Sequence, residues 1–324
     1  MSNFPDLDTI KATARNIEPY IIRTPTLPYY GQHTEVFGKM KVWLKMELLQ
    51  RTGSFKARGA INTVMQLSEQ QKSRGITAFS AGNHAIATAY AARALNTSGK
   101  VVMPRTANPY RVECCKNLGA EIVLGNDIAE LMDIVSELQE QEGRTVVHPF
   151  EGMHTFAGTA TVGLELYDDI PDLDAIIVPV GGGGLISGIA SAVKQINPDC
   201  KVYGVEPEGA QGMSISLAKG APIPEVSVST IADSLGAPMH LPLSYAIVEK
   251  FVDAMVTVSD EQLAASMQTI FTDLNLAVEP ACAAAITALK HPLKNELQSA
   301  RVGIIMCGSN IDFSTFSRFA SASV

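Results

Sequence analysis

Four short segments of the sequence carry residue types that could do chemistry together. The first, TGSFKARG at 52–59, places Lys56 after glycine and small polar residues. A lysine in such a turn is commonly only a solvated surface cation. A desolvated lysine amine is also a nucleophile and a base in enzymes. The other three segments favour this chemical role for Lys56.

Two segments combine small residues with the expected start of a helix: SAGNH at 80–84 and GGGGL at 181–185. Free backbone N–H groups and the positive end of a helix dipole favour anions at such turns. Four consecutive glycines lose much backbone entropy on folding, so a close approach to a ligand or a very tight turn has to justify them. We expect 181–185 to bind a phosphate. Ordinary helix capping at 80–84 and close helix packing at 181–185 are the alternatives.

The glycine run does not fit a dinucleotide fold. No register around 181–188 satisfies GxGxxG, so a nicotinamide or flavin cofactor loses its main support. The fourth segment, CGSN at 307–310, follows an apolar run like the others, and open parallel sheets bind ligands at the carboxyl ends of their strands. A lysine, an anion-binding turn, a phosphate loop and a neutral hydrogen-bonding group together suit a phosphorylated pyridine aldehyde.

The elements that must position these segments follow an α/β rhythm, in which short β-branched runs alternate with longer Ala-rich stretches. The expected strands are 42–46, 77–79, 100–103, 121–124, 146–148, 175–180, 201–205, 255–258 and 302–306. The expected helices are 84–95, 109–118, 128–142, 159–168, 185–195, 260–275 and 281–289. The strand–helix steps between 77 and 150 predict a small domain inserted within a large one formed by 1–76 and 151–324.

Composition excludes several classes of partner. The 324 residues are 46% apolar and carry a formal charge of -8, so the chain has no basic surface for nucleic acid. No apolar stretch reaches the ~18 residues of a membrane span, and no secretory signal is visible, which predicts a cytoplasmic location. The five cysteines are odd in number and form no CxxC pair, so neither a disulfide framework nor a zinc knuckle is expected. A small molecule is the expected partner.

Taken together, SFKxRGA at 54–60, SAGNH, GGGGL and CGSN resemble the serine/threonine dehydratase family of fold-type II pyridoxal-phosphate enzymes. The order and spacing match over nearly the whole chain. Weaker matches are KxExxQ at 45–50, LGA at 118–120, HPF at 148–150, GVEP at 204–207, IAD at 231–233 and EP at 279–280. The resemblance implies two lobes, each with a twisted, mostly parallel sheet flanked by helices, and a homodimer.

The resemblance also implies pyridoxal 5'-phosphate as cofactor, with Lys56 as the catalytic residue that carries it as a Schiff base. Phe55 would pack beside the cofactor ring, Asn83 would bond its 3-hydroxyl, and Cys307 would lie beside the pyridine nitrogen. The residues that would cradle the phosphate are Gly181, Gly182, Gly183, Gly184 and Leu185. The residues that would receive the substrate carboxylate are Ser80, Ala81, Gly82, Asn83 and His84.

The activity implied is that of an ammonia-lyase, which eliminates the β-hydroxyl of a small amino acid such as L-threonine or L-serine to give a 2-keto acid and ammonia. Related racemases place a serine where this chain has Ala81, so racemisation is expected to be minor. The family's AGQGT becomes AGTAT at 157–161, and its ADG becomes ADS at 232–234. Hydroxyaspartate, phenylserine and a hydroxyectoine breakdown product therefore stay open as substrates.

Three further alternatives stay open at this stage. Racemisation or β-replacement would keep the fold and the cofactor, whereas a non-catalytic binding protein would have no need of Lys56. Glu206 and the carbonyl of Ala210 match part of a monovalent or divalent cation site of some relatives, but Gly212 stands where a carboxylate ligand would be. Capping or pairing within the large lobe is the alternative role for Glu206.

Overall fold

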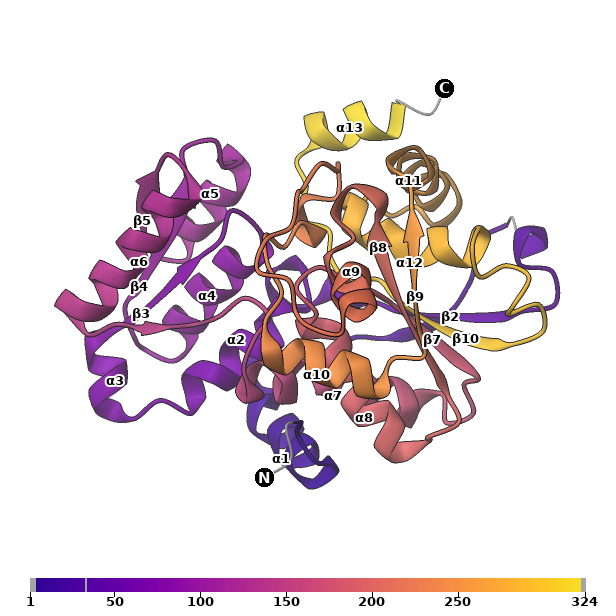
Figure 1. Cartoon of the computed structure of the whole chain (residues 1–324), viewed down its shortest axis with the longest axis horizontal. Helices are drawn as coiled ribbons and strands as arrows, with labels where there is room; N and C mark the ends of the chain where they lie inside the picture. Colours follow the sequence, from indigo (N-terminus) through magenta and orange to yellow (C-terminus); the bar gives the residue numbers. More distant parts are fainter. Residues whose placement is uncertain (1–3, 33, 322–324) are drawn as a thin grey trace.

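Two β-sheets organise the computed structural model, which describes residues 4–32 and 34–321 (Figure 1). The larger sheet has the strand order β1-β2-β10-β7-β8-β9, and every pair is parallel except β1 with β2. Its strands are β1 (Thr26–Pro28), β2 (Lys41–Lys45), β7 (Ala175–Pro179), β8 (Lys201–Pro207), β9 (Ala254–Val258) and β10 (Arg301–Ile305). The parallel strands require helical crossovers, which cover both faces.

The smaller sheet is wholly parallel and has the order β5-β4-β3-β6. Its strands are β3 (Ile76–Phe79), β4 (Gly99–Pro104), β5 (Glu121–Gly125) and β6 (Thr145–Val146). The helices beside it are α3 (Glu69–Arg74), α4 (Asn83–Ala94), α5 (Pro109–Asn117) and α6 (Ile128–Glu142). Figure 1 shows this sheet and its helices to one side of the larger sheet.

The remaining helices surround the larger sheet or join the two sheets. They are α1 (Leu7–Ile17), α2 (Lys56–Met65), α7 (Met153–Asp169), α8 (Gly184–Ile196), α9 (Gly212–Lys219), α10 (Pro242–Phe251), α11 (Asp260–Leu274), α12 (Pro280–Lys290) and α13 (Phe313–Ser321). Short 3-10 turns occur at Glu18–Tyr20, Thr34–Phe37, Glu47–Leu49, Arg51–Gly53, Glu208–Ala210 and Asp233–Leu235. Every residue of β7 is buried, and α12, which packs on β7 to β10, is almost wholly buried too.

Local signals explain why α6 begins and ends where it does. The Asp127 side chain accepts a hydrogen bond from the backbone of Glu130 at the amino end, and Gly143 adopts a left-handed conformation at the carboxyl end. The buried face carries Leu131, Val135 and Leu138, which lie on one side of a helix. The observed bounds therefore coincide with the sequence prediction of 128–142.

The sequence predictions for the other elements hold in class and differ at the edges. Each expected strand and helix is present, which confirms the α/β class. The helix expected from 159 begins at Met153. Its first residues were not expected to be helical because they are mostly buried and show no amphipathic period. Strand β1 was not expected, since three residues give no alternation to recognise. The expected helices also lacked α1, α2, α3, α9, α10 and α13. Within the described part of the chain, no helix has the length and apolarity to cross a membrane.

The strands divide between the sheets in the order that a domain insertion requires. Strands from residues 76–146 form the smaller sheet, and strands before and after them form the larger one. Helix α2 packs against both α4 and α7 and so connects the two parts. We keep the division into 77–150 and the flanking 1–76 and 151–324 as a proposal that this partition supports.

Candidate active site

The four motif segments meet where carboxyl ends of strands from both sheets face each other. Ser54 forms an isolated β-bridge with Gly308, and the backbone N–H of Phe55 donates to the Cys307 carbonyl at 3.2 Å. The SAGNH turn follows β3 and reaches the same place, where its Asn83 contacts Asn310. The structure thus brings three of the segments into direct contact across more than 200 residues of sequence.

Lys56 is the first residue of α2 and follows a tight turn in which Gly53 has a φ of 69°. Its half-buried side chain donates a hydrogen bond to the carbonyl of Pro149, with Nζ 5.1 Å from the centroid of the Phe55 ring. Burial lowers the pKa of Lys56 to about 8, and the negative charge of Glu279 opposes that effect. At pH 7 about a tenth of the amine is then neutral, far more than for an ordinary lysine, and the neutral amine is the nucleophile.

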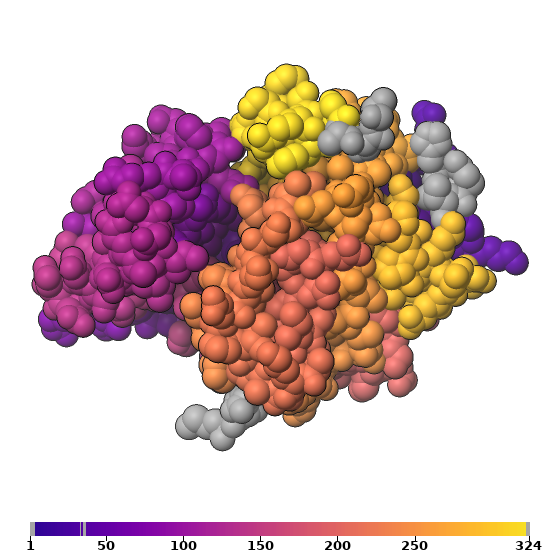
Figure 2. Space-filling model, turned by 45° about the horizontal axis from the view of Figure 1, so that its top comes forward, coloured from indigo at the N-terminus to yellow at the C-terminus, as the bar shows by residue number. Residues whose placement is uncertain are grey.

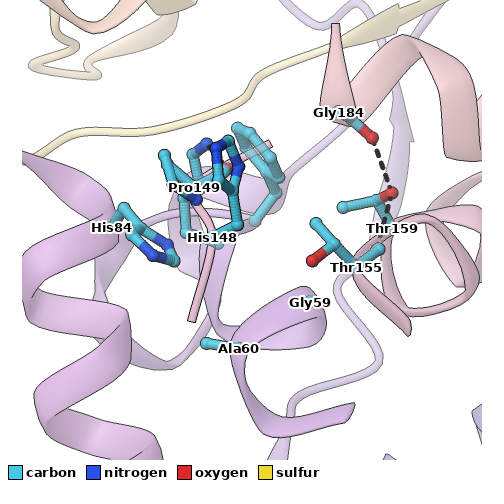
Figure 3. Close-up of a pocket in the computed structure, with 10 residues that line it drawn as sticks. Gly59, Ala60, His84, His148, Pro149, Thr155, Thr159 and Gly184 are labelled. Carbon is cyan, nitrogen blue, oxygen red and sulfur yellow. Dashed lines mark hydrogen bonds between the residues drawn. The ribbon is translucent and has the colours of Figure 1, made fainter. Parts of the chain in front are cut away.

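A small pocket lies behind Lys56, and Figure 3 shows the residues around it. His84 and His148 lie on one side, and Thr155 and Thr159 of α7 lie on the other. The lining residues are Phe55, Lys56, Gly59, Ala60, His84, His148, Pro149, Thr155, Thr159 and Gly184. This cavity is therefore lined by three of the predicted features: the lysine, the anion-binding turn and the glycine loop.

Both histidines of this pocket are neutral. Burial, followed by the positive charge of Lys56, lowers the pKa of His84 to about 3 and that of His148 to about 4. His84 Nε2 lies 2.7 Å from the Val147 carbonyl, which can only accept, so this nitrogen carries the proton. Among the residues that line the pocket, Lys56 is therefore the one cation.

The glycine loop is both a turn and a packing surface. Gly183 has a φ of 92°, and α8 begins at the next residue with no side-chain cap among the described residues. A Cβ at Gly182 would lie 2.2 Å from the Phe150 ring, and one at Gly184 would lie 2.7 Å from the Phe150 backbone. Close packing is thus present, and the uncapped helix start also leaves N–H groups for an anion. The uncapped helix start fits a phosphate held by backbone groups, whereas the packing against Phe150 accounts for Gly182 and Gly184 without a ligand.

The SAGNH turn is not an ordinary helix cap. No described side chain caps α4, and the Ser80 hydroxyl instead accepts a hydrogen bond from the backbone of Gly82 at 3.1 Å. Ala81 and Arg111 line a cleft of about 390 Å3 between the two lobes. Figure 2 shows the two lobes meeting beside the yellow carboxyl-terminal helix, whose Phe319 also lines this cleft. The turn can therefore be reached by a small molecule.

Cys307 is buried below the same site. The neighbouring Cys282 thiol, followed by burial, holds the pKa of Cys307 well above its usual range, so its thiol is neutral. A neutral thiol offers hydrogen bonding but no charge to a ring nitrogen. The residue types present at the junction therefore fit pyridoxal phosphate: an amine, a backbone phosphate loop, an amide and a neutral group.

Several residues with direct contacts to the site were not assigned a role from the sequence. Glu279 accepts a hydrogen bond from Asn83 Nδ2 at 2.7 Å, and burial raises its pKa to about 7. Arg111 pairs with Asp233 across the lobe junction at 2.5 Å. Glu279 and Asp233 belong to the weaker motif matches, whereas the sequence gives no signal for Arg111 beyond its charge.

Glu206 has a capping role. Its carboxylate accepts hydrogen bonds from the backbone of Met213 at 2.7 Å and of Ser214 at 2.9 Å, at the start of α9. Among the described residues, no group of three or more His, Cys, Asp or Glu side chains is placed to hold a metal ion. The cation site at Glu206 and Ala210 stays a prediction.

Comparisons with known proteins match nearly the whole chain. A family model described as pyridoxal-phosphate dependent enzyme matches residues 17–308. Phenylserine dehydratase from Ralstonia pickettii is 44% identical over 317 residues, which cover 98% of this chain and 97% of that one. L-threonine ammonia-lyase from Thermotoga maritima is 38% identical, with 96% and 77% covered. The structure of maize serine racemase superposes with a TM-score of 0.89 at 35% identity, with 98% and 97% covered.

Proposed function

The chain belongs to the pyridoxal-phosphate dependent enzyme family, and from that premise we propose that it eliminates the β-hydroxyl of a β-hydroxy amino acid to give a 2-keto acid and ammonia. The family's fold-type II architecture and cofactor are those expected from the sequence. The observation that carries the proposed reaction is a partly neutral Lys56 amine beside the glycine loop, with Ala81 in the turn expected to receive substrate.

The cofactor would be held by residues already described. Backbone N–H groups of 181–185 would bind its phosphate, Asn83 its ring oxygen, and Cys307 its ring nitrogen. When bound, pyridoxal phosphate withdraws electrons from the substrate Cα and so makes the proton there acidic. The neutral Cys307 thiol limits that withdrawal, which favours elimination over reactions that need a long-lived carbanion.

Lys56 Nζ is the base for the Cα proton in this proposal. Its lowered pKa keeps part of the amine free to accept a proton, and a base works best when its pKa is close to the working pH. The electrons of the Cα–H bond form the Cα–Cβ double bond as the Cβ–O bond breaks. The departing hydroxyl takes up the proton that Lys56 removed and leaves as water. The released enamine hydrolyses to a 2-keto acid and ammonia.

Ala81 supports elimination over racemisation. Racemisation needs a second proton donor on the face of Cα opposite the base, and the Ala81 methyl group has no proton to give. The similarity to serine racemase leaves racemisation as the second candidate function, tested by the appearance of D-amino acid.

The proposed substrates rest on two positions where this chain differs from the family's motifs and on one similar protein. Thr159 stands where the family has a glutamine, lines the pocket behind Lys56 and donates to the Gly184 carbonyl at 2.8 Å. Ser234 replaces a glycine near Asn83. Because the 44% identical relative is a phenylserine dehydratase, we propose phenylserine, threonine and serine as the first substrates to test.

A panel of L-threonine, L-serine, phenylserine, hydroxyaspartate and a hydroxyectoine-derived amino acid tests this proposal. The holoenzyme should release ammonia from at least one, with an equal amount of 2-keto acid. Failure with all of them, in a protein that binds pyridoxal phosphate, would contradict the proposed reaction. A homodimer, which the family resemblance implies, and a cytoplasmic location, which was expected from the sequence, are further proposals. Sedimentation velocity tests the first.

A further inference from the structure

Asn83 lies among polar side chains that come from segments far apart in the sequence. Its Nδ2 atom donates to Glu279 Oε1 at 2.7 Å, and its Oδ1 atom accepts from Asn310 Nδ2 at 2.7 Å. Asn83 begins α4, Glu279 precedes α12, and Asn310 follows β10. All three side chains are buried, with 5%, 1% and 6% of their surfaces exposed. Buried polar groups that satisfy one another in this way are rigid and specific.

The hydrogen bonds run in one direction only. The backbone carbonyl of Thr52 can only accept, and Asn310 Nδ2 donates to it at 2.7 Å. An amide nitrogen has two protons, so the second proton of Asn310 goes to Asn83, whose facing atom must be the oxygen. The Asn83 nitrogen then faces Glu279, a carboxylate. The two ends of the chain therefore fix the orientation of both amides.

Two motif glycines make room for this chain. A Cβ at Gly308 would lie 2.5 Å from Glu279 Oε1, and a Cβ at Gly53 would lie 2.6 Å from Asn310 Oδ1. Gly308, next to Cys307, and Gly53, three residues before Lys56, are thus needed where the polar chain passes. This packing gives those glycines a reason apart from any ligand.

Glu279 is costly to bury and does not serve its own helix. Its side chain caps no backbone N–H of α12 within the described structure, although the residue stands at the capping position. Ser234 Oγ donates to it at 3.3 Å, and Arg111, which also pairs with Asp233, lies 3.7 Å away. Burial raises its pKa to about 7 against the charge of Arg111. A buried carboxyl with a perturbed pKa beside a ligand site indicates a functional role.

We propose that Glu279 is a positioning residue whose carboxylate holds the Asn83 amide as a hydrogen-bond donor toward the ring oxygen of the cofactor. After its bonds to Glu279 and Asn310, Asn83 has a second N–H, whose partner is the Ser234 hydroxyl at 3.5 Å, and this weakly bound proton is the one that would turn to the cofactor. The inference rests on the proposed role of Asn83. It adds that Glu279 and Asn310 determine which atom Asn83 presents.

Substitutions at Glu279 separate the acceptor from the charge. Glu279→Gln keeps an acceptor of the same shape, and Glu279→Met removes it at similar side-chain length. Loss of a charge-assisted hydrogen bond should raise the Kd for pyridoxal phosphate in Glu279→Met about tenfold and shift the visible absorbance maximum of the bound cofactor. Glu279→Gln should raise the Kd by no more than about threefold, because a neutral acceptor remains.

Asp253→Asn is the matched control. This carboxylate accepts from the backbone of Val202 at 2.8 Å and pairs with Lys194 and Lys201 at the amino ends of β8 and β9, away from the site. The Asp253→Asn variant should have a lower melting temperature than wild type, with unchanged cofactor affinity and an unchanged absorbance spectrum. A folded Glu279→Met protein with wild-type Kd and absorbance would overturn the proposal. If Glu279→Met does not fold, Glu279→Gln provides the test. Because Glu279→Gln keeps its acceptor, a Kd raised more than about tenfold together with an unchanged spectrum would overturn the proposal.

These measurements use the holoenzyme without an amino acid. A wrong substrate assignment would leave them unaffected, so the two proposals fail separately. Asn310→Asp gives an independent arm, because it replaces the N–H that Asn83 Oδ1 accepts with a carboxylate oxygen. It should weaken cofactor binding at least as much as Glu279→Met, and wild-type binding in this variant would contradict the one-way chain.

Discussion

The side-chain nitrogen of Lys56 donates a hydrogen bond to the backbone carbonyl of Pro149. The next residue, Phe150, packs against Gly182 and Gly184, so the segment 148–150 contacts both the lysine and the glycine loop. His148 of the same segment lines the pocket behind Lys56. The resting position of the amine is therefore linked through three consecutive residues to the loop that would hold the phosphate.

Replacing Lys56 with alanine should abolish ammonia release and the visible absorbance of covalently bound cofactor, because no other lysine lines this pocket in the described structure. Lys100→Ala is the control, since Lys100 lies on β4 of the small sheet and pairs there with Glu121 and Glu142. It should keep both properties. Retention of the absorbance band in Lys56→Ala would require another attachment site.

The pH dependence of cofactor attachment should follow the lowered pKa of Lys56. Only the neutral amine attacks an aldehyde, so attachment to the apoenzyme should accelerate as pH rises, with a midpoint at about 8. An ordinary lysine would give a midpoint of about 10.4. Stopped-flow absorbance measures the rate, and N-acetyl-lysine corrects for titration of the cofactor itself. A midpoint matching the free amine would show that the site does not lower the pKa.

Gly183→Ala should weaken pyridoxal phosphate binding beyond its effect on folding. Gly183, which directly precedes α8, has a φ of 92°, and a Cβ there would lie 2.9 Å from the Met213 side chain of α9. Gly220→Ala is the matched control, because Gly220 has a φ of 70° and open space around its Cβ. Each variant should lose about 1–2 kcal/mol of stability from the left-handed backbone.

Cofactor titration and thermal unfolding of the two glycine variants separate these effects. Reduced affinity for pyridoxal phosphate should appear only in Gly183→Ala. If both variants bind it like wild type, the run at 181–184 serves packing against Phe150 and its neighbours, and the phosphate lies elsewhere.

Ala81→Ser should introduce measurable racemisation. The added hydroxyl is small, and Ala81 borders an open cleft, so folding should survive. Some D-amino acid should then form, though slowly, because a hydroxyl without supporting hydrogen bonds is a poor acid. Ala107→Ser makes the same chemical change in the same cleft and should give no D-product. Chiral chromatography reads the outcome, and equal D-product from both variants would remove the special role of position 81.

Local sequence signals predicted most of the fold and the motif segments. The caps Asp127 and Gly143 bound α6 where the pattern placed it. Asn83 and Gly184 each begin a helix, so a turn followed by a helical pattern marks both positions in the sequence. These signals are local, and neighbouring residues in the chain are enough to read them.

Residues whose contacts come from distant segments could not be predicted in the same way. Arg111 meets Asp233 across 122 positions and Asn83 meets Glu279 across 196, so no local pattern records either pair. Helix α7 illustrates the same limit for secondary structure, because a helix buried on nearly all sides lacks a polar face to mark its start at Met153.

The partition of products from one L-β-hydroxy amino acid tests the central claim most directly. With the unmodified holoenzyme and the best substrate of the panel, ammonia, 2-keto acid and D-isomer are measured in the same reaction over time. Ammonia and keto acid should form in equal amounts, with D-isomer at less than about one hundredth of their rate, because Ala81 supplies no second proton donor. D-isomer formed at a rate comparable with ammonia release would contradict the assignment and indicate a racemase.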